Sequence, residues 1–146
     1  MSENEGLFSD LRVVEVASMF MAPTAATILA DFGAEVIKVE SPDGDNLRRL
    51  HQIKGMPESD IEYCNLLVNR NKKGLVLDLK QPAAIEALHK LIASADIFIT
   101  NYRPKAQARL KIAFDDVKEI NPRLIYAYAS GYGETGPDVD QPGYDM

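Results

Sequence analysis

Hydrophobic residues along the chain fall into five short runs, separated by segments whose apolar residues recur at helical spacing. The runs are rich in β-branched and aliphatic side chains, which is typical of strands buried on both faces of a parallel sheet. Because helical patterns separate the runs, the sequence predicts an α/β fold with a doubly wound, mostly parallel sheet. The predicted strands are Arg12–Ala17, Val36–Val39, Leu75–Asp78, Ile97–Thr100 and Leu124–Ala129.

The first run opens a strand–helix–strand unit that covers Leu11 to Glu40. Pro23 fits the first turn of a helix, where its missing N–H group costs no hydrogen bond. Gly33 stands where such a helix ends in a left-handed residue. Since a helix joins the two strands, we expect a right-handed parallel crossover.

Further helices are predicted at 82–94, 104–110 and 114–120, where prolines fit the first turns of the first two and Asn121-Pro122 ends the third. Between the second and third strands, Ser41–Gly74 shows little periodicity. We predict a long irregular connection there, and loops of that length often carry function.

A glycine motif of dinucleotide-binding form, GxGxxG, occurs at residues 131–136, after the fifth predicted strand. In a dinucleotide site the glycines open a helix whose N-terminus meets the pyrophosphate. Here Pro137 and Pro142 follow instead, together with Asp138 and Asp140, whose carboxylates would repel phosphate. We therefore interpret the motif as a turn and expect no dinucleotide at this loop.

Composition predicts a soluble globular protein with one domain. The chain has 146 residues, 46% hydrophobic and 26% charged, and no apolar run approaches the roughly 20 residues of a membrane helix. Residues 1–10 form an acidic, polar segment unlike a secretory signal. Cys64 is the single cysteine, which excludes an internal disulfide and favours a reducing compartment, here the cytoplasm. One cysteine and two histidines are poor material for a metal site, so none is expected.

The net charge of −6 argues against nucleic-acid binding, but the charge is unevenly distributed. Residues 41–111 carry twelve Lys and Arg against eight Asp and Glu, a local balance of +4. This basic middle is compatible with a bound anion, although charge counting alone favours an ordinary solvated surface.

Four polar side chains lie at or just beyond the carboxyl ends of predicted strands: Lys80, Asn101, Tyr102 and Arg109. In an open α/β sheet, ligands bind outside those ends. Lysine and arginine neutralise phosphate, asparagine binds a base edge and tyrosine stacks on it. Together these residues suit a nucleotide that carries several phosphates, although each alone is more often a solvated side chain.

Four motifs occur along the chain in this order: LRVVEVASMFMAPTAATILADFGAEVIKVESPDGDNLR, NRNKKGLVLDLK, ADIFITNYRP and NPRLIYAYASGYGETGP. In these motifs the chain resembles the N-terminal part of the class III CoA-transferases, the group that contains carnitine and formyl-CoA transferases, with the 2-methylacyl-CoA racemases as relatives. The resemblance implies that residues 11–146 are part of a Rossmann-like CoA-binding domain. It also implies that CoA is a substrate and that no cofactor is tightly bound.

The resemblance further implies which positions contact CoA. One lies in the loop after the first strand, near the thioester; two match the end of the third strand; three follow the fourth. These residues are Phe20, Leu77, Lys80, Asn101, Tyr102 and Arg109. Relatives often carry arginine after the second strand, where this chain has Ser41, and Arg48 or Arg49 is a candidate replacement.

Members of the family resemble one another in using an aspartate that attacks the thioester to form a mixed anhydride and then an aspartyl-CoA thioester. The resemblance places that aspartate beyond Met146, so no catalytic residue is assigned with certainty. Tyr144 and Asp145 match a motif near the active site and are candidates for an assisting role. Racemase relatives carry histidine at the position of Tyr144, and tyrosine is a poor base at neutral pH, which favours transfer over racemisation.

Three functions stay open at this point: a CoA-transferase acting on an acyl-CoA and a carboxylic acid, a 2-methylacyl-CoA racemase or isomerase, and a non-catalytic nucleotide-binding module. We expect the native protein to continue past Met146, because the final Gly/Pro/Asp-rich stretch leads into no helix or strand. The resemblance implies an interlocked homodimer for the full-length protein. We expect the 146-residue chain alone to be inactive.

Overall fold

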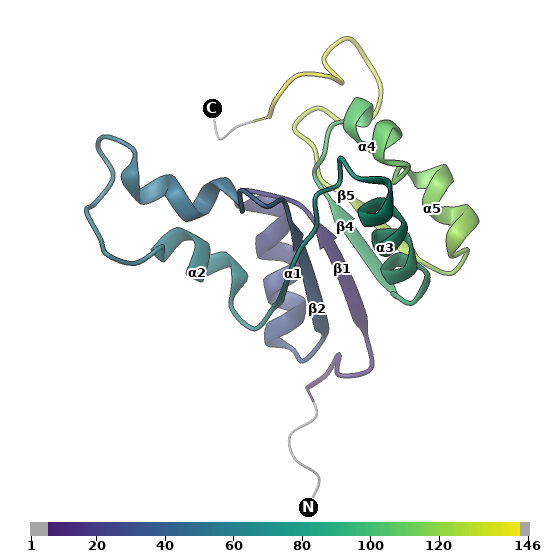
Figure 1. Ribbon diagram of the computed structural model, residues 1–146, viewed down its shortest axis with the longest axis horizontal. Helices are drawn as coiled ribbons and strands as arrows, with labels where there is room; N and C mark the ends of the chain where they lie inside the picture. Colours follow the sequence, from purple (N-terminus) through teal and green to yellow (C-terminus); the bar gives the residue numbers. More distant parts are fainter. Residues whose placement is uncertain (1–5, 144–146) are drawn as a thin grey trace, which may run out of the picture.

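The structure is a computed structural model that describes residues 6–143. Its centre is a five-stranded sheet with the order β3-β2-β1-β4-β5, in which every neighbouring pair is parallel (Figure 1). The strands are β1 (Arg12–Val16), β2 (Glu35–Glu40), β3 (Lys73–Val76), β4 (Ile97–Thr100) and β5 (Ile125–Tyr128). The predicted α/β class and the parallel pairing of all five runs are confirmed.

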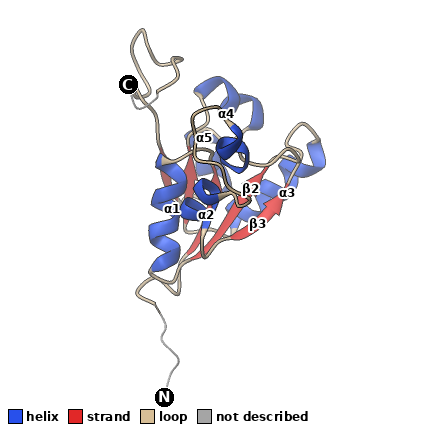
Figure 2. Ribbon diagram, turned by 90° about the vertical axis from the view of Figure 1, so that its left-hand side faces the viewer, coloured by secondary structure: helices blue, strands red, loops and turns tan. Residues whose placement is uncertain are grey.

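Helices cover both faces of the sheet, as a doubly wound fold requires. Figure 2 shows α1 (Met21–Asp31) on one side of the strands and α3 (Pro82–Ala93) on the other. Two shorter helices, α4 (Pro104–Leu110) and α5 (Phe114–Ile120), lie on the α3 side, where their buried residues join the same hydrophobic cluster. The predicted bounds of these two short helices are confirmed, and α3 ends one residue before the predicted position.

The end of α1 depends on Gly33, as the sequence predicts. Its φ angle is +105°, a conformation that L side chains rarely adopt. A Cβ atom at this position would also come within 2.8 Å of the Cα atom of Gly6. The chain can therefore turn from α1 into β2 while the N-terminal segment packs across the turn.

The prediction of an irregular connection between the second and third strands is wrong. The segment contains a 3-10 helix, η1 (Asn46–Gln52), and an α-helix, α2 (Tyr63–Asn69). Both are short, and α2 buries Cys64 and Val68 while Leu66 and Leu67 stay exposed, so neither shows a clear apolar periodicity. Tertiary contacts of Leu47, Cys64 and Val68 stabilise them instead.

The third strand lies two residues earlier than the sequence predicts, at Lys73–Val76. It is an edge strand, paired only with β2 among the described strands, and its register places Val76 beside Glu40. The charged side chain of Lys73 and the small Gly74 are tolerated in this strand because its open edge faces solvent. Leu77 follows the strand and still donates its N–H group to the carbonyl of Glu40 at 2.9 Å.

The glycine motif at residues 131–136 opens no helix, which confirms its interpretation as a turn. The described residues after β5 form turns and bends, and the N–H group of Gly133 donates to the hydroxyl of Ser130 at 2.9 Å. Among residues 6–143 the structure holds no helix with the length and apolar character needed to cross a bilayer.

Candidate functional site

The strand order reverses between β1 and β4, and this is where a ligand site is expected. After β1 the chain winds outward to β2 and β3, then returns to β4 on the other side of β1. The register places Val16 beside Thr100, so β1 and β4 end at the same edge of the sheet. In open α/β sheets, ligands bind in the crevice outside the carboxyl ends of the strands at such a reversal.

Asn101 joins the two loops that leave this point. Its amide oxygen accepts the N–H group of Ser18 at 3.1 Å, and its amide nitrogen donates to the Ser18 carbonyl at 2.7 Å. The sequence predicts Asn101 as a nucleotide contact; the structure places it at the expected edge, with its amide bonded to the loop after β1. That loop also carries Phe20, so the two predicted residues lie on loops that are bonded to each other.

Tyr102 and Leu77 are half-buried and pack against the same hydrophobic cluster on the α3 side of the sheet. The N–H group of Tyr102 donates to the hydroxyl of Thr100 at 3.2 Å, which fixes the chain directly after β4. Burial raises the pKa of the Tyr102 hydroxyl, an effect that the nearby Lys38 only partly opposes. Tyr102 is therefore a neutral ring at physiological pH, suited to packing or stacking.

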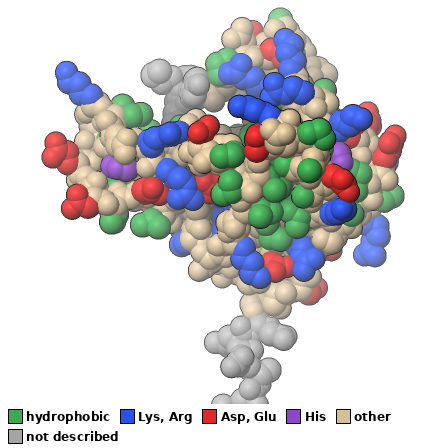
Figure 3. Space-filling model, in the orientation of Figure 1, with side chains coloured by type: hydrophobic (Ala, Val, Ile, Leu, Met, Phe, Trp, Pro, Cys, Tyr) green, Lys and Arg blue, Asp and Glu red, His purple; other side chains and the backbone are tan. Residues whose placement is uncertain are grey.

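Lys80 and Arg109 are exposed, and among the described residues neither forms an ion pair. Lys80 lies in a turn after β3, where its N–H group donates to Asp78 at 3.1 Å. Arg109 lies in the last turn of α4, a place where a cation also interacts favourably with the helix dipole. Figure 3 shows that basic side chains gather over α4, at the upper end of the molecule. These cations are available to phosphate from solvent.

Glu40 ends β2, the position at which dinucleotide-binding sheets carry the acid that holds a ribose hydroxyl. Here both carboxylate oxygens accept from the guanidinium of Arg48, each at 2.8 Å, and the N–H group of Asp45 donates at 2.9 Å. The hydrogen bonds from Arg48 hold the pKa of Glu40 below its usual value, despite partial burial. Arg48 also pairs with Glu62, whereas Arg49 is exposed. Glu40 is therefore engaged within the protein.

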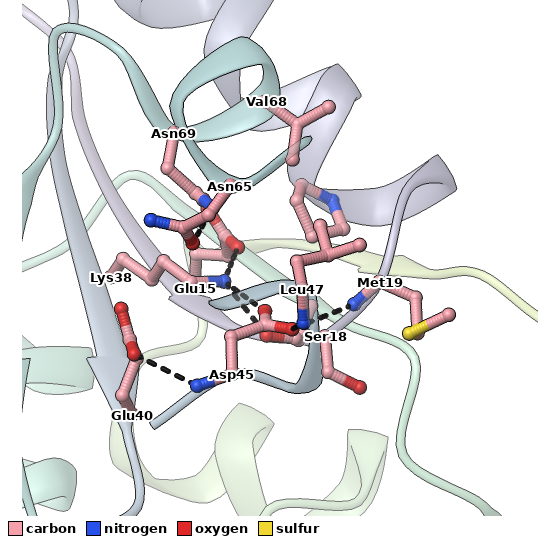
Figure 4. A network of polar contacts seen from close by, with 12 residues as sticks. Glu15, Ser18, Met19, Lys38, Glu40, Asp45, Leu47, Asn65, Val68 and Asn69 are labelled. Atoms are coloured by element: carbon pink, nitrogen blue, oxygen red, sulfur yellow. Dashed lines mark hydrogen bonds and ion pairs between the residues drawn. The ribbon is translucent and has the colours of Figure 1, made fainter. Parts of the chain in front are cut away.

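A buried network of four charged side chains lies beneath the loop after β1, and the sequence analysis missed it. We call Glu15, Lys38, Asp45 and Lys72 the ion network. The ammonium of Lys38 lies 2.8 Å from Glu15 and 3.0 Å from Asp45 (Figure 4). The ammonium of Lys72 lies 2.7 Å from Glu15. All four side chains are at most 2% exposed. Two positive and two negative groups leave the network neutral.

The two lysines respond differently to the same burial. Burial opposes the charged form of Lys38, but the carboxylates of Glu15 and Asp45 outweigh it and raise the pKa of this lysine. Burial lowers the pKa of Lys72, because it has a single direct carboxylate partner in Glu15 and is repelled by Lys38. Backbone carbonyls of Pro23 and Val68 complete its contacts, each at 2.8 Å.

One signal in the sequence could have revealed the network. Glu15 and Lys38 interrupt two runs of valine and isoleucine that were predicted to be buried on both faces. Buried charges are almost always paired, so opposite charges in neighbouring parallel strands should have been matched with each other. The register confirms this pairing, because Glu15 stands directly beside Lys38.

Tyr144 and Asp145, the two candidate assisting residues, lie outside the described residues. Within residues 6–143, no group of three or more His, Cys, Asp and Glu side chains is arranged to hold a metal ion.

Comparisons with known proteins support the resemblance drawn from the motifs. The profile of CoA-transferase family III matches residues 8–146. The chain is 44% identical over 146 residues to cinnamoyl-CoA:phenyllactate CoA-transferase of Clostridium sporogenes, covering 99% of this chain and 35% of that protein. It is also 44% identical over 140 residues to (R)-2-hydroxy-4-methylpentanoate CoA-transferase of Clostridioides difficile, covering 95% of this chain and 35% of the relative.

A solved structure agrees with the sequence relatives. The crystal structure of a CAIB/BAIF family protein from Brucella suis superposes with a TM-score of 0.87 at 32% identity, over 97% of this chain and 38% of that one. The chain thus spans about 35% of the length of the curated relatives it matches. Because the family profile matches all five strands and the loops at their carboxyl ends, the chain belongs to CoA-transferase family III.

Proposed function

We propose that this chain is the CoA-binding part of an acyl-CoA:carboxylate CoA-transferase. The observation that carries the proposal is the family match over residues 8–146, together with relatives named as CoA-transferases. The geometry supports it, since Asn101 and Lys80 lie on a loop and a turn that follow β4 and β3, at the carboxyl edge of a doubly wound sheet.

In this proposal the chain binds and orients the CoA moiety. Lys80 and Arg109 neutralise its phosphates, because they are exposed and have no ion-pair partner among the described residues. Tyr102 and Leu77 offer half-buried apolar surface, and Phe20 lies on the loop at the strand reversal. Engagement of Glu40 by Arg48 argues against a dinucleotide, because no free acid is left to hold a ribose hydroxyl.

The chemistry that we propose for the whole protein uses an aspartate outside this chain. Its carboxylate attacks the thioester carbonyl, the CoA thiolate leaves, and an acyl-aspartyl anhydride forms. The thiolate then attacks the aspartyl carbonyl and releases the first acid, which leaves an aspartyl-CoA thioester from which CoA passes to the acceptor acid. A carboxylate suits this route because its acyl anhydride keeps the activation of the thioester. We propose a homodimer located in the cytoplasm as the working form.

A racemase acting on 2-methylacyl-CoA is the alternative. That reaction needs a base that removes the proton next to the thioester carbonyl. Tyr144 stands where racemase relatives carry histidine, and a phenol with an ordinary pKa near 10 is mostly protonated at neutral pH. The sequence therefore favours transfer.

Calorimetry with CoA and with NAD tests the ligand. We expect the protein, as its gene encodes it, to bind CoA and to bind NAD much more weakly. The double variant Lys80→Ala/Arg109→Ala should bind CoA at least about tenfold more weakly, because it lacks two phosphate contacts worth roughly 1 kcal/mol or more each. The matched control is Lys54→Ala/Lys118→Ala, which removes two exposed lysines that are not among the predicted contacts. Tighter binding of NAD, or unchanged CoA affinity in the first variant, would contradict the proposal.

Acyl exchange tests the activity. Labelled acyl-CoA is offered to a panel of carboxylic acids, with the whole protein and with the 146-residue chain. We expect exchange with the whole protein and none with the chain alone, because binding without a nucleophile does not open the covalent route. Exchange by the chain alone that Asp145→Asn abolishes would instead make Asp145 the nucleophile.

A further inference from the structure

We propose that Asp45 is a positioning residue, which acts through the ion network to hold the loop between β1 and α1 in the shape that receives the acyl end of CoA. The inference rests on the proposed function and deepens it. It assigns a role to buried charges that neither the predicted contacts nor the transfer chemistry uses.

Asp45 connects the loop to the rest of the fold through three neighbours. One carboxylate oxygen accepts the N–H group of Met19 at 3.3 Å and that of Leu47 at 3.0 Å. The other lies 3.0 Å from the ammonium of Lys38. Figure 4 shows the carboxylate between Lys38 on one side and Leu47 and Met19 on the other. Asp45 is 4% exposed, so water competes little for these contacts.

Lys38 holds the same loop from its other end. Its ammonium donates to the carbonyl of Ala17 at 3.0 Å while it pairs with Glu15 and Asp45. Asn101 bonds both backbone groups of Ser18 from the β4 side. Three successive residues of the loop, from Ala17 to Met19, are therefore each fixed by a polar side chain from another element.

The loop needs this support because its backbone is strained. Met19 has a φ angle of +66°, in the left-handed region that favours glycine. Such conformations persist only where the surroundings determine them, and they concentrate at functional sites. Phe20 follows Met19 directly and is one of the predicted contacts near the thioester. Release of Met19 into an ordinary conformation would turn the chain at Phe20 away from its present position.

The ion network also reaches past the loop to the helices that flank it. Glu15 is shared between Lys38 and Lys72, and Lys72 donates to carbonyls at the start of α1 and at the end of α2. Hydrogen bonds are directional, including those that link the charged groups here, whereas apolar contacts are not. A directional network can therefore fix one loop shape where an apolar cluster of the same size would permit several.

The decisive experiment compares two ligands in the protein as its gene encodes it. Acetyl-CoA reaches the loop, whereas adenosine 3′,5′-bisphosphate carries only the nucleotide end of CoA. We expect Asp45→Asn to lower the affinity for acetyl-CoA by about tenfold or more, because displacement of a contact by roughly an ångström is costly. The affinity for adenosine 3′,5′-bisphosphate should change little. Asp43→Asn is the matched control, since Asp43 is an exposed acid two residues before Asp45.

A second substitution separates positioning from general stability. Met19→Gly permits a positive φ angle without strain, so in the Asp45→Asn background it should restore part of the lost acetyl-CoA affinity. A parallel loss of both ligands would show a general structural role and overturn the proposal. Unchanged acetyl-CoA affinity in a folded Asp45→Asn protein would overturn it as well.

If Asp45→Asn does not fold, hydrogen exchange of the wild-type protein tests whether Asp45 holds the loop. We expect the amide proton of Met19, which is donated to Asp45, to be protected without ligand, in the way that strand amides are. Exchange at the rate of an open loop would overturn the proposal. Failure of the wild-type protein to bind any CoA would overturn the proposed function instead, and exchange would still report whether Asp45 holds the loop.

Discussion

The two faces of the sheet are built from different interactions. On the α3 side, large side chains fill the space, and Phe98, Leu88 and Ile112 are fully buried among apolar neighbours. On the α1 side, the cluster beside the strands consists largely of alanine and valine. The ion network lies on this side, near the carboxyl ends of β1 and β2. The α3 side is therefore stabilised by large apolar side chains. The α1 side is packed with small side chains and contains paired charges.

Small side chains explain how α1 packs. Ala22, Ala26 and Ala30 recur at every fourth position and are all buried, so the helix backbone lies close to the strands. That leaves little room for bulky groups at the carboxyl end of the sheet, where the long stems of Lys38 and Lys72 fill the space under α2. The lysine stems thus serve as core while their ammonium groups find carboxylates.

The difference between the faces matches their tasks. The apolar face stabilises the fold, and contacts of this kind depend little on direction. The charged face adjoins the loop at the strand reversal, where the position of a few atoms decides what can bind. Buried ion pairs are poor sources of stability but effective sources of specific geometry in some proteins. Three substitutions, from the largest expected effect to the smallest, can break or sharpen this comparison.

The largest loss is expected for Lys38→Met. The substitution keeps the apolar stem but leaves Glu15 and Asp45 buried with fewer positive partners. Removal of one partner from a buried pair costs about 3–5 kcal/mol, which urea unfolding can measure. The control is Lys73→Met, which breaks an exposed pair with Glu35 and should unfold like the wild type. Equal unfolding curves for the two variants would show that the ion network contributes little.

On the apolar face, Leu88→Ala should cost about 2–4 kcal/mol, because it removes a fully buried side chain and leaves a cavity. The two faces should then differ in their response to pH as well as in the size of the loss. The loss in Leu88→Ala should be the same at pH 5 and pH 8, since the cluster around Leu88 consists of apolar side chains and tyrosines, whose ordinary pKa near 10 lies above this range. A loss that changes strongly between these pH values would contradict the division between the faces.

The smallest effect is expected at the Glu40–Arg48 pair. Because the folded pKa of Glu40 is lowered, its ionised form stabilises the fold above its unfolded pKa, about 4.3. This stabilisation is lost as pH falls through the folded pKa. Glu40→Gln should therefore weaken the protein near neutral pH and flatten the fall in unfolding free energy between about pH 5 and pH 3. An identical acid profile in wild type and Glu40→Gln would show that the pair is not coupled to folding.

The pattern of apolar residues predicted the secondary structure wherever an element is long enough, or is bounded by residues such as proline that mark its ends. Proline at the start of α4 and an Asn-Pro stop after α5 located these helices correctly, and short apolar runs located β1, β2 and β4 within one residue. The same reasoning failed for η1 and α2, whose residues lack a periodic apolar face. It also placed β3 two residues late, because only pairing with β2 decides which residues of an edge segment form the strand.

For the candidate site, too, some features could be predicted from the sequence and others could not. The sequence alone determined the order of strands and helices, the family motifs and the presence of polar residues after β3 and β4. Tertiary structure alone decided that Asn101 bonds to Ser18, that Glu40 is engaged by Arg48, and that Asp45 meets Lys38. The reason is physical: local patterns record burial and turn chemistry between near neighbours, whereas these contacts join segments that only the winding of the sheet brings together.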